Sequence, residues 1–150
     1  DTLIGGSLRL TPESSSIYTG LTVSATAPTG EEETGLGAGE WTYAPSLDGE
    51  KRWNTFYLRA TGGGLIDETG GDALAFASIG AGYDLTPLVT STLSLNWAQS
   101  PDDQFDDAAE ATLSIGFRLP NNAYLSSFAL AGVTDASPDI GGGVTLSVSR

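Results

Sequence analysis

The chain has 150 residues and a formal net charge of −13, with 20 glycines, a single lysine and no cysteine, histidine or methionine. The absence of Cys and His excludes disulfides, Cys-type zinc sites and catalytic triads of the Ser-His-Asp or Cys-His kind. Nucleic acid is not an expected partner, because binding it requires clustered Lys and Arg.

No apolar run reaches the roughly 18 residues of a transmembrane helix. The chain opens on Asp1 and begins without the apolar stretch of a signal peptide, so we interpret it as a mature or trimmed product.

Along the chain, apolar and polar residues alternate with a period of two, and no sustained helical stripe occurs. In the sixth alternating segment, for example, Leu93, Leu95 and Trp97 share one face, and Ser94 and Asn96 share the other. The segments are longer than the about five or six residues of a typical strand, and their length suits a tilted strand that crosses a bilayer. Nine segments are predicted: 2–10, 16–27, 40–50, 54–64, 73–85, 89–99, 109–119, 123–133 and 140–149.

The connections between these segments alternate between two classes. Short turns are expected at 11–15, 49–53, 86–89 and 120–123. Long, acidic, glycine-rich loops are expected at 28–39, 65–72, 100–108 and 134–139. Short turns at one end and long loops at the other are typical of an antiparallel up-and-down sheet.

The polar face of the segments is made mainly of Ser, Thr, Gly and Asn, which suits a crowded lumen better than a solvated surface. Its few charged residues are the candidates for lining the lumen: Arg9, Asp48, Glu50, Arg59, Asp84, Glu110 and Arg118. They could line a selective path, or they could be paired ions that plug a narrow barrel, because lone charges in a tight lumen are costly.

Aromatic residues assigned to the apolar face lie near segment ends, where membrane barrels carry aromatic girdles: Trp41, Tyr43, Tyr83, Trp97 and Tyr124. The predicted fold is therefore a single all-β domain over 1–150, an antiparallel up-and-down transmembrane β-barrel of about eight to ten strands. The alternative is a soluble β-sandwich or β-barrel that acts as a binding module.

The odd number of segments raises a question of closure, since the first and the last of nine up-and-down strands run in the same direction. Bacterial single-chain barrels normally have an even number of strands. Three explanations are open: an upstream strand is missing, the first segment is miscounted, or another chain supplies the closing edge.

The long loops together with Glu40 contain thirteen of the nineteen acidic residues and no Lys or Arg, whereas Lys51 and Arg52 lie at the opposite end. Glu31, Glu32 and Glu33 are the main acidic loop candidates. Such loops would raise the local cation concentration at a pore mouth and would need divalent cations beside anionic lipopolysaccharide. They could equally serve only the solubility of exposed loops.

The acidic residues Asp102, Asp103, Asp106 and Asp107 are a weak calcium candidate, because their spacing suits oxygen ligands better than an uninterrupted acidic run does. Otherwise we expect no metal and no cofactor.

Catalysis is not expected either. The remaining enzyme class would use two carboxylates, such as Glu50 and Glu110 in a glycosidase, but ion pairs from these residues to Arg59 or Arg118 are the favoured interpretation.

Several stretches carry a family resemblance: "PTG…GLGAGEWTYAPSLDGEKR" (28–52), "SIGAGYDLTPLVTSTLSL" (78–95), "ATLSIGFRLPNNAYLSSFALAGVTDASPD" (111–139) and the closing "GGGVTLSVS". Together they resemble the Gram-negative outer-membrane barrels of the transporter-like family named for the meta-pathway of phenol degradation. The match covers most of the chain through repeated short stretches. It departs from the family pattern at the end, where Arg150 stands in place of the usual aromatic residue, and several tyrosines are replaced by Ala or Ser.

This resemblance implies a bacterial outer-membrane location, with the lipid bilayer and lipopolysaccharide as partners. It also implies a pore or uptake channel for small solutes, with hydrophobic solutes as one option. The alternative is a closed barrel with a structural or interaction role. The oligomeric state is left open.

Overall fold

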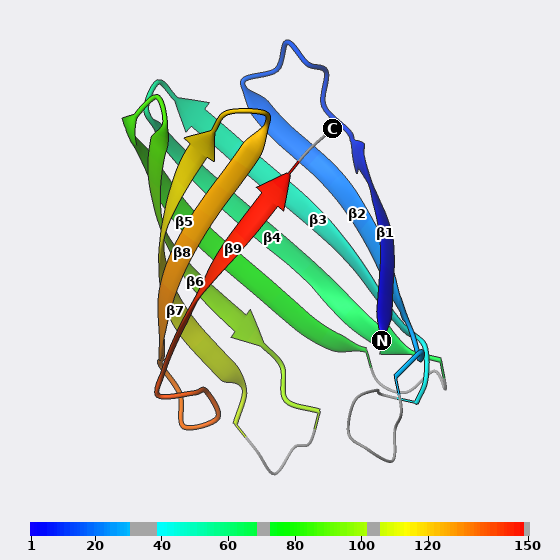
Figure 1. Cartoon of the computed structure of the whole chain (residues 1–150). Coiled ribbons are helices and arrows are strands. Elements are labelled where there is room, and N and C mark those ends of the chain that lie inside the picture. Colours follow the sequence, from blue (N-terminus) through cyan, green and yellow to red (C-terminus); the bar gives the residue numbers. More distant parts are fainter. Residues whose placement is uncertain (31–38, 69–72, 102–105, 149–150) are drawn as a thin grey trace.

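The computed structural model describes residues 1–30, 39–68, 73–101 and 106–148, which form one antiparallel β-sheet without a helix (Figure 1). Each strand pairs with the strands that precede and follow it in the sequence. The strands are β1 (Thr2–Arg9), β2 (Ile17–Ala27), β3 (Thr42–Trp53), β4 (Phe56–Asp67), β5 (Leu74–Thr86), β6 (Val89–Ala98), β7 (Ala108–Leu119), β8 (Ala123–Gly132) and β9 (Ile140–Val148). The predicted all-β, antiparallel, up-and-down arrangement is confirmed. In these parts of the chain, no helix has the length and apolar character needed to cross a bilayer.

The strand boundaries lie within three residues of the predicted ones, and the largest shifts are at the C-terminal ends of β3 and β4, the first of which changes the β3–β4 hairpin. There the predicted turn at 49–53 was wrong: β3 continues to Trp53, and the turn is made by Asn54 and Thr55. Asn54 has a φ of 51°, and Asn121 and Asn122 in the β7–β8 turn have φ values of 61° and 55°. Asn tolerates this left-handed region better than most residues with a Cβ, which makes these tight turns possible.

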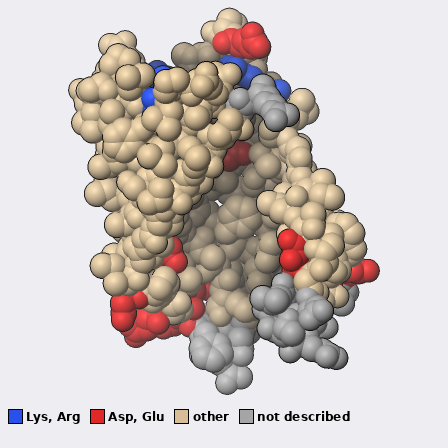
Figure 2. Space-filling view, viewed as in Figure 1, with Lys and Arg blue, Asp and Glu red and all other residues tan. Residues whose placement is uncertain are grey.

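The sheet curls into a deep trough but does not close into a barrel. The two edge strands, β1 and β9, do not contact each other, and they run in the same direction on either side of an opening (Figure 1). Figure 2 shows that this opening exposes a hollow interior. Because β1 pairs with β2 from Thr2 to Arg9, the explanation that the first segment was miscounted is wrong.

Apolar side chains cover the outer, convex face of the sheet, the reverse of a protein with a conventional core. Ile79 is 61% exposed, Leu93 58% and Leu113 49%, although all three lie near the middle of long strands. Among the described residues, the only buried hydrophobic ones are Ala27 and Tyr57. The apolar faces of β6 and β7 therefore do not point into a shared core, as they would in a soluble sandwich.

On the inner face, aromatic rings lie against glycines of the wall and leave the hollow unfilled. A Cβ placed on Gly82 would overlap the ring of Tyr57 on the neighbouring strand, and the same holds for Gly116 and the ring of Tyr124. Tyr124 was predicted to lie on the apolar face, and that prediction was wrong. Tyr124 lies directly opposite Arg118 in the β7–β8 pair, so the two side chains share the inner face of the sheet. A position near the end of a strand does not determine which face a residue occupies.

We predict that Gly82→Ala lowers the free energy of unfolding by about 1–3 kcal/mol, the usual cost of overpacking a filled site. The ring of Tyr57 cannot move freely, because its hydroxyl forms a 2.6 Å hydrogen bond with Thr92 Oγ1. Gly62→Ala is the matched control, since a Cβ there would meet no atom within 4 Å. Urea unfolding in detergent measures both variants, and equal stabilities would contradict the packing of Tyr57 on Gly82.

Candidate functional site

The inner wall carries a row of polar side chains that crosses five neighbouring strands. Strand register places Asp48 opposite Thr61, Thr61 opposite Ser78, Ser78 opposite Asn96, and Asn96 opposite Glu110. The alternation predicted from the sequence puts all five side chains on one face, and pairing of neighbouring strands brings them to one level. The row therefore forms a polar band across the inner wall from β3 to β7.

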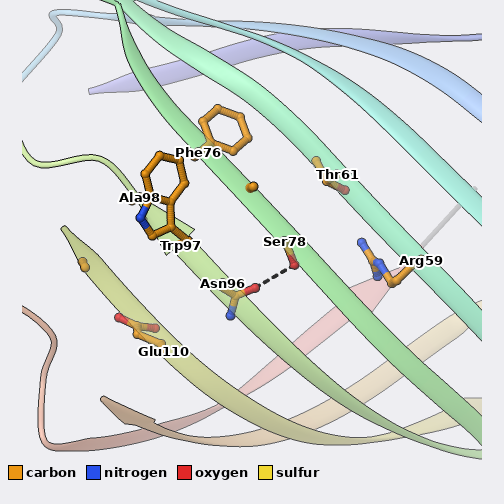
Figure 3. Close-up of a pocket in the computed structure, with 10 residues that line it drawn as sticks. Arg59, Thr61, Phe76, Ser78, Asn96, Trp97, Ala98 and Glu110 are labelled. Carbon is orange, nitrogen blue, oxygen red and sulfur yellow. Dashed lines mark hydrogen bonds between the residues drawn. The ribbon is translucent and has the colours of Figure 1, made fainter. Parts of the chain in front are cut away.

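Hydrogen bonds hold two parts of this polar band in place. Asp48 accepts bonds from the hydroxyls of Thr22 (3.0 Å) and Thr61 (2.8 Å). Further along, Ser78 Oγ donates to Asn96 Oδ1 at 2.8 Å, the bond drawn in Figure 3, and Asn96 Nδ2 donates to Thr112 Oγ1 at 3.1 Å. Asp48, predicted as a lumen residue, thus lines the inner wall as an acceptor held by two threonines.

Two cavities adjoin this band on the inner wall. The larger has a volume of about 450 Å³, and its lining includes Thr61, Phe76 and Asn96 (Figure 3). The smaller has a volume of about 260 Å³, and its lining includes Tyr18 and Glu50. Arg59 and Thr61 line both cavities, so the two hollows meet at these residues.

An ionic cluster centred on Arg52 lies nearer the short-turn end. The Arg52 guanidinium is 2.7 Å from Asp84 Oδ2 and 3.5 Å from Glu50 Oε1, and its central carbon lies 4.4 Å from the centre of the Tyr57 ring. Asp84 also accepts a 2.8 Å bond from the Thr90 hydroxyl. The partner of Glu50 is therefore Arg52, and the favoured pairing of Glu50 with Arg59 or Arg118 was wrong.

Sequence reasoning missed Arg52 because it ended the third segment at residue 50 and placed Arg52 in a turn. The sequence pattern could nonetheless have identified Arg52. Asp48, Glu50 and Arg52 are spaced two residues apart, so they share one face of the strand once β3 extends to Trp53. In this cluster the predicted interior ions are paired rather than free.

Two of the predicted lumen cations are bound to the backbone of short turns. Arg9 donates to the carbonyls of Thr11 (3.0 Å) and Pro12 (3.2 Å), and Arg118 lies 3.5 Å from the carbonyl oxygen of Pro87. Their charges thus sit at the rim of the trough rather than at mid-height on the wall.

Arg59 and Glu110 differ from the other interior ions. Within the parts of the chain that the structure describes, neither side chain forms a hydrogen bond or an ion pair, and both line the larger cavity (Figure 3). Arg59 extends past Gly80, where an added Cβ would lie 3.4 Å from the Arg59 Cγ. The larger cavity therefore holds one unpaired cation and one unpaired anion.

Acidic residues gather at the end of the trough that carries the long loops, and Lys and Arg gather mainly at the other end (Figure 2). Glu31, Glu32, Glu33, Asp102 and Asp103 lie outside the described residues.

Asp107 accepts bonds from the Trp97 indole (3.2 Å) and the Ser100 amide (2.9 Å). Over the described ranges no cluster of three acidic groups is placed to hold a metal ion, so the calcium prediction, half of which lies outside them, stays a prediction.

Fold and site together define a curled up-and-down sheet with an apolar outer face and a polar, partly charged inner wall. No model of a known protein family matches the chain, and no curated protein matches its sequence. The geometry of the two faces of the sheet is therefore the basis for assigning a function.

Proposed function

We propose that this protein is a bacterial outer-membrane β-barrel that acts as a pore or uptake channel for small solutes. The observation that carries the proposal is the inverted distribution of polarity, with apolar side chains outside and polar side chains inside. In water the exposed apolar face would be unfavourable, whereas in a bilayer it contacts lipid tails of the same character.

Strand length supports a membrane-spanning role. β6 has 10 residues and β7 has 12. At about 3.3 Å per residue, ten residues reach roughly 33 Å, and a tilt of about 40° reduces this to roughly 25 Å. That height matches the apolar band of about 25 Å around outer-membrane barrels.

The inner wall supports a path for solutes rather than a plugged interior. The rings of Tyr57 and Tyr124 lie against the wall, and cavities of about 450 Å³ and 260 Å³ remain inside. Polar groups at several heights could replace water around a small solute as it passes. The acidic loop end would attract cations to one mouth and would need divalent cations to lie beside lipopolysaccharide.

Reconstitution tests the proposal. We expect the purified protein to float with liposomes and to give discrete conductance steps in a planar bilayer with asymmetric KCl, with a cation preference that weakens as salt rises. Neutralising Glu31, Glu32 and Glu33 to Gln should reduce that preference. Flotation without any conductance would favour a closed barrel with a structural or interaction role. A protein that stays monomeric in buffer without detergent and does not float would contradict the membrane proposal.

A further inference from the structure

The larger interior cavity is lined by two opposite charges that do not meet. Arg59 on β4 and Glu110 on β7 form no ion pair and no hydrogen bond within the part of the chain that the structure describes. Glu110 is half-buried, whereas Arg59 is exposed to the hollow. Fixed charges in a concave site with apolar walls concentrate ligands of opposite sign. This cavity therefore offers one partner for an anionic group and one for a cationic group.

Strand register keeps the two charges apart. Arg59 lies opposite Gly80 on β5, which lies opposite Ser94 on β6. Ser94 lies opposite Thr112 on β7, two residues from Glu110. Neighbouring strands are about 4.8 Å apart, so the three intervals from β4 to β7 separate the Cα atoms of Arg59 and Glu110 by about 14 Å along the wall. Both side chains line the concave side of the sheet, so we expect their charged ends to lie closer together than their Cα atoms.

Two polar side chains, Ser78 and Asn96, lie between the charges and have hydrogen-bonding capacity left over (Figure 3). Ser78 Oγ donates to Asn96 Oδ1, and Asn96 Nδ2 donates one of its two hydrogens to Thr112 Oγ1. Over the described residues, the second Asn96 Nδ2 hydrogen and the lone pairs of Ser78 Oγ have no partner. One donor and one acceptor on neighbouring strands complement the C=O and N–H of a peptide group.

We propose that the larger cavity binds a short zwitterionic peptide of two or three residues. Its carboxylate lies on Arg59, its ammonium group on Glu110, and a peptide group between them on Asn96 and Ser78. This inference names a solute class for the proposed pore and therefore rests on that function. The cavity volume of about 450 Å³ is within the roughly 300–1,000 Å³ of small-molecule sites.

The distance between the two charges selects the length of the solute. An extended dipeptide spans about 7 Å and a tripeptide about 10 Å. Both lengths fit within the roughly 14 Å between the Cα atoms of Arg59 and Glu110 once the two side chains project inward. A single amino acid spans at most about 3.6 Å, so it would leave one of the two charges without its partner.

The charge asymmetry of the trough favours the same orientation of the peptide. Glu110 is level with Thr61, two residues nearer to the long-loop end than Arg59. Acidic residues gather at that end, and Lys and Arg gather mainly at the other (Figure 2). An ammonium group directed toward the acidic end and a carboxylate directed toward the basic end align the peptide with the field of the whole trough.

Phe76 gives the cavity an apolar side near Glu110. It precedes Ser78 on the same face of β5, toward the long-loop end, and an added Cβ on Gly63 of β4 would overlap its ring. The ring therefore lies against the wall and presents a face to the hollow. With the ammonium group on Glu110, the first side chain of the peptide lies near this ring, so an apolar first residue is favoured.

The test uses phenylalanyl-alanine and two blocked forms of it, titrated calorimetrically into the full-length protein in detergent. The N-acetyl form lacks the ammonium group, and the C-terminal amide form lacks the carboxylate. We expect the zwitterion to bind at least about ten-fold more tightly than either form, which corresponds to about 1.4 kcal/mol. Free phenylalanine, with both charges on one residue, should also bind at least about ten-fold more weakly than the dipeptide.

Two substitutions assign each charge of the peptide to its partner. In Arg59→Gln the zwitterion should lose its advantage over the amide form but keep its advantage over the N-acetyl form. Glu110→Gln should have the opposite effect. Lys51→Gln removes a positive charge from the outer face and is the matched control, so both preferences should stay as in the wild type.

Equal affinities of the zwitterion and either blocked form for the wild-type protein would overturn the inference, and this comparison needs no variant that has to fold. Binding of free phenylalanine as tight as that of the dipeptide would also overturn it. Flotation and conductance of the same preparation separate the two proposals. A protein that floats and conducts KCl without distinguishing the peptides contradicts the peptide site alone, whereas a protein that neither floats nor conducts contradicts the pore.

Discussion

Leu113→Lys is expected to destabilise the membrane-inserted protein by about 2–4 kcal/mol, the cost of a lysine on the lipid face near the bilayer midplane. Leu113 lies at the centre of β7 on the outer face and is 49% exposed. In lipid its neighbours would be acyl chains, which cannot hydrogen-bond to an ammonium group or screen its charge. A loss of 2 kcal/mol or so corresponds to a roughly 30-fold change in the folding equilibrium.

Ser114→Lys is the matched control, because it adds the same charge one residue away on the inner face. Ser114 pairs with Thr92 and Phe128 inside the trough, where water can solvate a cation. We therefore expect little loss of stability from Ser114→Lys. Both variants are measured by folding into liposomes and by urea unfolding. An equal loss in both, or a Leu113→Lys variant that is more soluble and equally stable in plain buffer, would contradict a lipid-facing outer surface.

Arg59→Gln is expected to raise the preference of the pore for cations over anions by about 30-fold. A unit positive charge near a passing ion contributes about 1 kcal/mol in a wet lumen, against a cation and in favour of an anion, so its removal changes the cation-to-anion ratio by about 2 kcal/mol. Arg59 is suited to this effect because it lines both interior cavities and has no ion-pair partner among the described residues. Glu110→Gln should change the preference in the opposite direction, since it removes the unpaired anion of the larger cavity.

Lys51→Gln is the control for the Arg59 variant, because it removes the same charge from the outer face. Lys51 pairs with Leu58, and its ammonium group lies 5.4 Å from the centre of the Trp53 ring. Reversal potentials in asymmetric KCl measure all three variants, and the Lys51 variant should match the wild type. A shift of equal size for Lys51→Gln and Arg59→Gln would mean that net charge alone, and not the interior position of Arg59, sets the selectivity.

The strands and their two faces could be derived from local sequence patterns. Period-two alternation identified all nine strands, because a strand places successive side chains on opposite faces whatever its partners are. The same rule placed Asp48, Arg59 and Glu110 on the polar face. The alternation of short turns with long acidic loops also predicted the up-and-down order, since each tight turn forces the next strand back beside the previous one.

Which side chains pair with one another, and whether the sheet closes, could be learned only from the folded chain. Arg52, rather than Arg59 or Arg118, pairs with Glu50 because β3 extends three residues past its predicted end. Tyr124 lies inside because strand register, a relation between two segments, determines its face. Alternation within one strand contains no information on whether β1 and β9 meet. The answer depends on the curl accumulated over the whole sheet, and here that curl leaves the two edges apart.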